Sequence, residues 1–248
     1  MLDKEIKAFH MIQPYRMVHE TWADDTVHIL RAEIVQGLPE MLPVILGDCL
    51  QNMRAALEHL AWELVVVGDG DPGSKTGFPI FKDDPFALDA DKRLTNSFRN
   101  KVRGMPEEAI AILKRLQPHL GDEPEHEFLW LLNEYANIDR HQTLNVVLAI
   151  SDYIDAQPGK RDNYGKFIPD DSNVLDDMMV NDVFVHGAEL YRATLREPDP
   201  NMKMEYNSPL YITFGKAREV MGKPAVDILQ GMLRYIEQIV LPQFVRFF

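Results

Sequence analysis

The sequence predicts an α+β fold, in which a helical bundle carries an N-terminal β-hairpin and an antiparallel sheet lies between the middle helices and the C-terminal helix. Two observations lead to this class. Apolar residues recur at steps of three and four in long stretches, and short β-branched or aromatic runs gather at the start of the chain and over 146–214. Because strands and helices are segregated along the chain, we expect a single α+β domain over 1–248.

The first elements are a hairpin and a long helix. Two strand-like runs, 17–22 and 26–34, flank a short turn-like stretch, which predicts a hairpin within about 13–35. The next stretch predicts a helix over about 40–66, because its apolar residues keep helical spacing: Leu42, Leu46, Cys49, Leu50, Met53, Leu57, Leu60 and Leu64. The glycine-rich run 68–73 then ends it.

The remaining helices occupy the middle and the end of the chain. The middle helices, within about 40–145, include one over 107–119 that Pro106 opens and one over 124–140, while 85–103 is helical only in pieces. A C-terminal helix over about 224–241 ends at Pro242.

Short strands are expected over about 146–214. The runs VVLAI, DVFVH, ELYRATL, MKMEY and LYITF predict an antiparallel sheet of four or five strands. Polar residues dominate 155–178, so we expect an exposed loop there.

Charge limits the ligands that the protein can bind. A net charge of −13 repels phosphate, so nucleic acid requires a local reversal of the field. The segment 92–119 supplies one, because seven lysines and arginines face only two glutamates there. We therefore expect RNA to bind through this segment, with contacts from Lys92, Arg93, Arg99, Lys101 and Arg103.

The cysteine content and the absence of common motifs narrow the kinds of site and ligand that we expect. The single cysteine, Cys49, cannot form an intrachain disulfide, and its helical position predicts a buried thiol. Neither a signal-peptide start nor an apolar run of membrane-spanning length is present, so we expect a cytoplasmic protein without a membrane partner. The usual nucleotide-binding and hydrolase motifs are absent from the sequence, and we expect no cofactor.

Arg54 and His59 are the candidate catalytic pair. At 100° per residue they lie about 140° apart around one helix. In the structural interpretation, Arg54 pairs with Glu58 one turn on, and His59 finds a partner such as Asp48 or Glu63. In the functional interpretation, two copies of the helix meet in a dimer, with histidine transferring the proton of a ribose hydroxyl and arginine stabilising the phosphate charge without a metal.

The Arg-x4-His spacing resembles the HEPN superfamily of helical bundles, whose ribonuclease members carry such a pair. The resemblance implies a HEPN-like helical fold and a metal-independent endoribonuclease that uses Arg54 and His59; Ala55 stands where that group usually has a polar residue. The residue pattern of GDCLQNMRAALEHLAWEL, with FPIF and NIDRH after it, also resembles that of uncharacterised bacterial and phage proteins. This resemblance implies no activity.

A second polar constellation lies at the end of the helix over 124–140. Glu134, Asn137 and His141 follow at helical steps with Arg140 beside them, so they either support His59 or simply complement the helix dipole. Glu123 to His126 matches the Glu-x-x-His spacing of di-iron bundles, but no second copy exists, and we expect no metal.

Together, these patterns predict an RNA-binding protein or metal-independent ribonuclease that forms a homodimer. The alternative is a non-catalytic interaction or scaffold protein in which Arg54 and His59 are structural.

Overall fold

The computed structural model describes residues 2–87, 91–123, 127–142, 144, 146–150, 155–179, 185–207, 210–215 and 223–248. They form two compact units: Met1–Leu42 with Asn145–Ala225, and Pro43–Leu144 with Val226–Phe248. Within these described ranges, strands are confined to the first unit, whereas the second is built from helices. The single domain expected over 1–248 stays a prediction.

The first unit opens with a helix and the predicted hairpin. Helix α1 (Leu2–Met11) was not predicted; it precedes β1 (Tyr15–Trp22) and β2 (Val27–Ile34), which pair antiparallel. The turn between the strands places Ala23, Asp24 and Asp25 in the left-handed region, with φ of 53°, 54° and 63°. The hairpin is confirmed.

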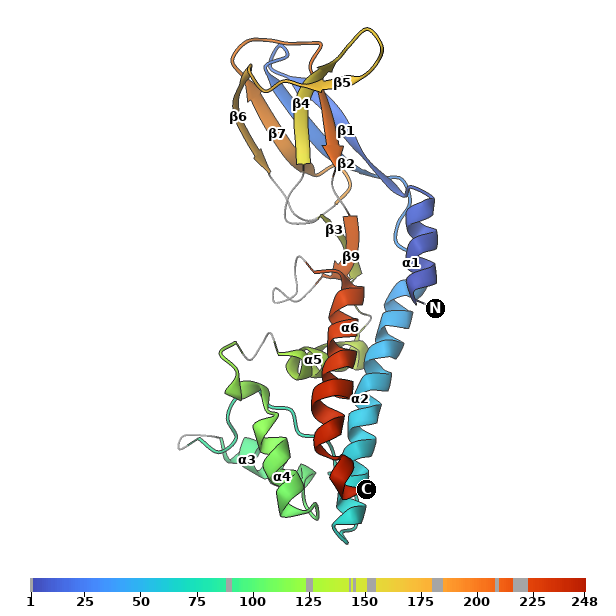
Figure 1. Ribbon diagram of the computed structural model, residues 1–248, viewed down its shortest axis with the longest axis vertical. Helices are drawn as coiled ribbons and strands as arrows, with labels where there is room; N and C mark the ends of the chain where they lie inside the picture. The colour runs from blue at the N-terminus through green and yellow to red at the C-terminus, as the bar shows by residue number, and fades with distance from the viewer. Residues whose placement is uncertain are drawn as a thin grey trace. The chain divides into compact units, whose positions relative to one another are not determined.

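Seven strands follow within the described part of 146–214. They are β3 (Val146–Ile150), β4 (Asp155–Arg161), β5 (Phe167–Pro169), β6 (Val174–Met179), β7 (Glu189–Leu195), β8 (Lys203–Asn207) and β9 (Leu210–Phe214). They do not make one sheet: the strand orders are β1-β2-β7-β6, β3-β9 and β5-β4-β8 (Figure 1).

The loop expected over 155–178 is wrong, because β4, β5 and most of β6 lie there. Several of their residues are polar and exposed, as are Asp176 and Asp177 of β6. This composition masks the apolar alternation by which a half-buried strand is predicted. Part of the predicted strand DVFVH, residues 182–184, lies outside the described residues.

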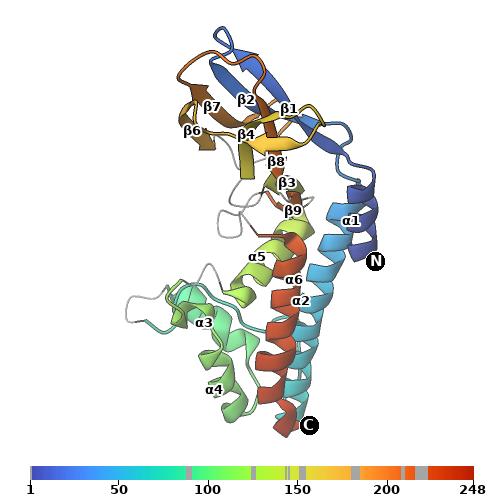
Figure 2. The ribbon, with the colours of Figure 1, turned by 45° about the horizontal axis from the view of Figure 1, so that its top comes forward.

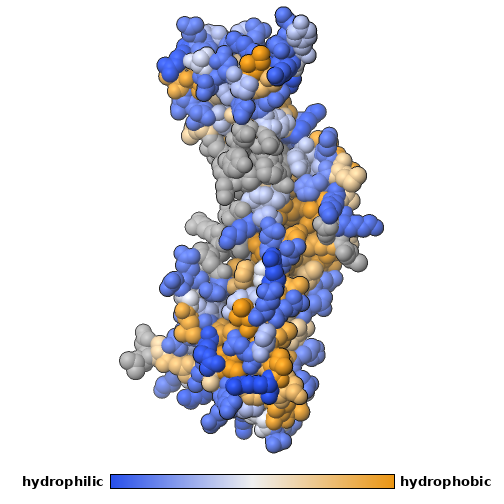
Figure 3. Space-filling view, in the orientation of Figure 1, coloured by the Kyte–Doolittle hydropathy of each residue, from blue (hydrophilic) through white to orange (hydrophobic). Residues whose placement is uncertain are grey.

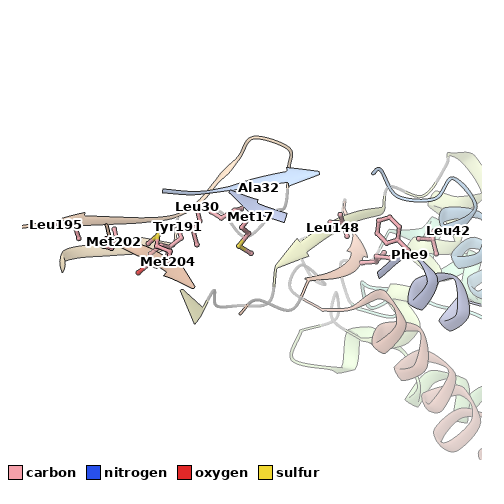
Figure 4. Packing of buried hydrophobic residues seen from close by; sticks show 13 residues of the cluster. Phe9, Met17, Leu30, Ala32, Leu42, Leu148, Tyr191, Leu195, Met202 and Met204 are labelled. Atoms are coloured by element: carbon pink, nitrogen blue, oxygen red, sulfur yellow. The ribbon is translucent and has the colours of Figure 1, made fainter. Parts of the chain in front are cut away.

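The core of the first unit joins strands that are distant in sequence. In Figure 4, Met17 of β1, Leu30 of β2 and Tyr191 of β7 come together with Met202 and Met204. Consecutive residues of β2, from His28 to Leu30, are buried, so both faces of this strand are covered. β2 is also a central strand, with β1 along one edge and β7 along the other, and these neighbours pair its buried backbone groups.

The second unit contains five helices in the described chain: α2 (Met41–Val67, entered from the first unit), α3 (Lys92–Lys101), α4 (Glu107–Arg115), α5 (Phe128–His141) and α6 (Ala225–Tyr235). Figures 1 and 2 both show α6 beside α2. No described helix combines the length and apolarity that crossing a bilayer requires.

The four predicted helices are confirmed, with different ends. Helix α4 stops at Arg115 because Pro118 cannot continue it, and the short 3-10 turn η1 (Pro118–Leu120) follows. After α6 the chain continues as the π-helical turn η4 (Ile236–Val240) and the 3-10 turns η5 (Leu241–Gln243) and η6 (Val245–Phe247). The expected start of α5 at Pro124 lies outside the described residues.

The predicted fold class is therefore wrong in its arrangement. Across the residues that the structure describes, six α-helices accompany three sheets, rather than a helical bundle with a hairpin and one separate sheet. The hairpin forms half of a four-stranded sheet, because β7 pairs with β2 from far along the chain. Such long-range pairing leaves no local signal in a sequence.

Helices α2 and α5 approach closely at a glycine. Gln51 Nε2 of α2 donates to the Ala136 carbonyl at 2.8 Å and to Asp139 Oδ2 at 3.0 Å. One turn earlier, a Cβ on Gly47 would collide with the Asp139 carboxylate. The absence of a side chain at Gly47 thus lets Asp139 lie against α2.

Gly47→Ala should destabilise the protein by ~1–3 kcal/mol, because the added methyl displaces a carboxylate held by Gln51. At an unconstrained helix position the same change stabilises by ~0.5–1 kcal/mol. Urea unfolding measures the effect, and the Asp139→Ala background is the control, in which Gly47→Ala should lose its cost. Equal effects in both backgrounds would contradict the close contact.

Candidate nucleic-acid interface

Arg54 is a buried residue whose side chain holds a backbone segment. It lies on α2 with 8% of its surface exposed. Its Nη2 forms an ion pair with Glu58 Oε1 and donates to the Phe78 carbonyl at 3.0 Å. Glu58 Oε2 in turn accepts from the Phe78 amide at 3.0 Å. The two side chains therefore bind both polar groups of one buried residue.

Gln117 binds two more backbone groups of the segment that contains Phe78. The stretch 78–81 is buried, and it pairs with no strand in the part of the chain that the structure describes. Gln117 Nε2 donates to the Pro79 carbonyl at 3.0 Å, and Gln117 Oε1 accepts from the Phe81 amide at 3.1 Å. We call Arg54, Glu58 and Gln117 the backbone clamp.

The clamp has a charged neighbour at the end of α3. Lys101 lies near Glu58: a Cβ on Gly77 would come within 2.5 Å of Glu58 Oε2 and 3.3 Å of Lys101 Nζ. Burial lowers the pKa of Lys101; Glu58 opposes this shift and the charge of Arg54 adds to it. Lys101 is thus drawn toward α2 rather than toward solvent.

The charges around Arg54 act on it in opposite directions. Burial lowers the pKa of Arg54, Glu58 opposes that shift, and Arg140 adds to it. Arg54 Nη1 is buried without a hydrogen-bond partner among the described residues. Arg54 keeps its charge because guanidinium groups stay protonated in proteins.

His59 lies elsewhere on the same helix. It is exposed, as are Asp48, Asn52 and Glu63 on its side of α2. The structure does not bring Arg54 and His59 together within one chain, as their angular separation predicts. The expected Arg54–Glu58 pair is confirmed, whereas a catalytic role for Arg54 and His59 stays a prediction.

The constellation at the end of α5 does not assemble around His59. Asn137, Arg140 and His141 are exposed, and Glu134 is half-buried. The α5 residue that meets α2 is Asp139, through Gln51. Arg140 acts on Arg54 through its charge, and the supporting roles of these α5 residues toward His59 stay predictions.

The residues predicted to bind nucleic acid divide between two sides of α3. Lys92, Arg93 and Arg99 are exposed on the helix, and Arg103 is exposed in the turn that follows. We call these four the basic face of α3. Lys101 points the other way, on the side of the buried Phe98. Because α3 contains no Asp or Glu, no carboxylate within the helix neutralises this face.

Two further expectations concern metals and the thiol. Among the described residues no group of three histidine, cysteine, aspartate or glutamate side chains is placed to hold a metal, although Pro124, Glu125 and His126 lie outside them. The burial expected for Cys49 is wrong: the thiol is half-buried, and partial burial raises its pKa, with Asp48 adding to the shift.

Comparison with protein-family models, with curated proteins and with solved structures gives no match for this chain.

Sequence reasoning missed Glu58, Gln117 and Asp139 as organisers of the second unit. The helical spacing of Arg54 and Glu58 did signal their ion pair. Phe78, the residue that both side chains bind, lies beyond a glycine-rich turn. No local pattern predicts this contact. For Gln117 the sequence offers one indication of a structural role: it is a polar residue between Leu116 and Pro118 at a helix end.

Arg54→Ala should destabilise the second unit by ~3 kcal/mol, because it leaves Glu58 and a buried carbonyl without their partner. This value is the lower end of the range for breaking a buried ion pair, because the Glu58 side chain is 38% exposed. Urea unfolding followed by circular dichroism measures it. The control is Arg115→Ala, the same substitution at an exposed arginine of α4, which should change stability by less than ~0.5 kcal/mol. Equal stability of the two variants would argue against the clamp.

Proposed function

We propose that this protein binds single-stranded RNA through the basic face of α3 and does not cut it. The observation that carries the proposal is the exposure of Lys92, Arg93, Arg99 and Arg103 together. Lys92 and Arg99 are seven residues apart, so they lie on one line along the helix, and Arg103 follows in the turn after it. Such a line of cations suits a phosphate backbone.

The negative charge of the rest of the chain favours RNA binding at the basic face of α3 over binding elsewhere on the molecule. With a net charge of −13, most of the molecule repels a polyanion. A strand is therefore attracted only where the field reverses. Cytoplasmic RNA, the ligand expected from the sequence, remains the proposed partner.

We expect no cleavage because of the geometry of Arg54. Its guanidinium is occupied by Glu58 and the Phe78 carbonyl and is almost fully buried. A phosphate could reach it only after that pair opened. A guanidinium held in this way supports a structural role better than transition-state stabilisation.

We infer that a second copy of the chain is the other partner. Asn52, Ala55, His59, Trp62 and Val66 are all exposed and recur at alternating steps of three and four along α2. This is the spacing by which two helices interlock side chains. Trp62 is 46% and Val66 47% exposed, and Figure 3 shows apolar side chains at the surface over α2. A homodimer would cover this seam.

Reversing one charge should identify the RNA-binding face. Arg99→Glu should weaken binding of a fluorescent 12-nucleotide RNA about tenfold. The slope of log affinity against log salt should also fall by at least ~0.7, the value for one lost phosphate contact on a single strand. Fluorescence anisotropy over a salt series measures both quantities.

Lys4→Glu is the matched control, because it makes the same charge change at an exposed lysine of α1. It should alter affinity less than about twofold, the range of a long-range charge effect under screening. In the same samples, with EDTA present, the RNA should be recovered uncut. Equal losses in both variants would refute the basic face, and EDTA-resistant cutting that His59→Ala removes would restore the ribonuclease hypothesis.

Ala55→Glu should dissociate the homodimer, because it places a charge in the middle of the seam. Light scattering should give twice the 28.5 kDa chain mass for the parent protein and a single chain mass for the variant. Ala111→Glu, the same substitution at an exposed position of α4, should leave the mass unchanged. A parent protein with the mass of one chain would exclude the dimer.

A further inference from the structure

A polar pocket adjoins the basic face of α3. The glycine-rich loop after α2 and the end of α3 enclose a volume of about 540 Å³. Asp71, Ser74 and Lys75 line it from the loop, and Asn100 and Arg103 line it from the helix side. Because Arg103 belongs to both surfaces, a strand along α3 runs directly to the pocket. The volume falls in the ~300–1,000 Å³ range of small-ligand sites.

The walls of the pocket are held by backbone hydrogen bonds. The Gly77 amide donates to the Lys101 carbonyl at 3.2 Å and ties the loop to the end of α3. Within the loop, the Gly73 amide donates to Thr76 Oγ1 at 3.0 Å, and the Thr76 amide donates to the Gly73 carbonyl at 2.9 Å. The loop is thus shaped before a ligand arrives, which lowers the ordering cost of binding.

Two glycines that line the pocket, Gly70 and Gly104, carry no side chain that would fill it. Gly104 has φ of +90°, a conformation that favours glycine. A Cβ on Gly70 would come within 3.0 Å of the Gly104 Cα. The two backbones therefore pack directly on each other, and no side chain fills the space above them from either position.

Three carbonyls at the end of α3 are already paired and do not face an anion as free groups. The Phe98, Lys101 and Val102 carbonyls accept the amides of Val102, Gly77 and Met105, at 3.2, 3.2 and 3.1 Å. The partial negative charge of the helix end is also offset by Arg99 and Lys101 in its last turn. Arg103 and Lys75 add two further cations for an anionic group in the pocket.

The chemistry of the lining has two parts. Lys75 and Arg103 are cations suited to a phosphate. Asp71 repels a phosphate but accepts hydrogen bonds from hydroxyl groups. A ligand that fits both parts carries a phosphate and a neighbouring hydroxyl donor, as a ribonucleotide does. Asn100 and Ser74 add further polar groups for a sugar or base edge.

We propose that this pocket holds one ribonucleotide of the bound strand, and the inference rests on the RNA binding proposed above. Lys75 and Arg103 bind its phosphate, and Asp71 accepts a hydrogen bond from its ribose 2′-hydroxyl. DNA has no such hydroxyl, so a DNA strand meets the repulsion between its phosphates and the exposed Asp71 carboxylate without gaining that hydrogen bond. The pocket thus makes the protein select RNA over DNA, whereas the basic face of α3 binds either strand.

Two 12-nucleotide strands of the same base sequence, one RNA and one DNA, test this selection by fluorescence anisotropy. The parent protein should bind RNA about tenfold more tightly than DNA. Asp71→Ala should reduce that ratio below about two, mainly by improving DNA binding. Lys75→Gln should weaken both strands several-fold. Asp83→Ala, at an exposed aspartate outside the pocket, is the matched control and should keep the parent ratio.

The outcomes separate this inference from the proposed function. If the parent protein binds both strands equally, and Arg99→Glu weakens both, RNA selection by the pocket is wrong while binding along α3 stands. An RNA preference that Asp71→Ala leaves intact also overturns the inference. Failure of either strand to bind would overturn the pocket and the basic face together.

Discussion

The second unit depends on keeping one buried segment hydrogen-bonded without a strand partner. The stretch 78–81 lies between helices, where an unpaired backbone group costs ~1–3 kcal/mol. Arg54 and Glu58 from α2, and Gln117 just after α4, pair with the Phe78 amide and carbonyl, the Pro79 carbonyl and the Phe81 amide. Because these side chains come from two helices, satisfying the segment also fixes α2 and α4 against it.

This constraint decides which residues remain available for a ligand. Arg54 has the residue type that phosphate chemistry needs, but its charge is committed to Glu58 and to a carbonyl. Lys101 is drawn to the same carboxylate, so α3 turns its other cations outward. The clamp and the basic face are thus two sides of one arrangement: ordering the interior leaves Lys92, Arg93, Arg99 and Arg103 in solvent.

The sequence predicted elements well where a local period exists and poorly where pairing is long-range. The helices around Leu57, Ile112 and Met232 and the hairpin turn at 23–25 follow from spacing and turn residues. The sheet arrangement does not, because β7 pairs with β2 across more than half of the chain. The site shows the same division. Arg54 and Glu58 signal each other at one helical turn, whereas their bonds to Phe78 depend on a fold that no local pattern encodes.

The backbone clamp also bears on how this protein avoids self-association in the wrong place. A short apolar stretch such as 78–81, once its amides and carbonyls are unpaired, is a template on which another chain's strand can add. Pro79 removes one donor from the stretch, and Arg54, Glu58 and Gln117 bind the backbone groups of Phe78, Pro79 and Phe81. Loss of the clamp therefore leaves the backbone of 78–81 open to pairing with another chain, as well as weakening the fold. Molecules that have lost these contacts should aggregate more than their loss of stability alone implies.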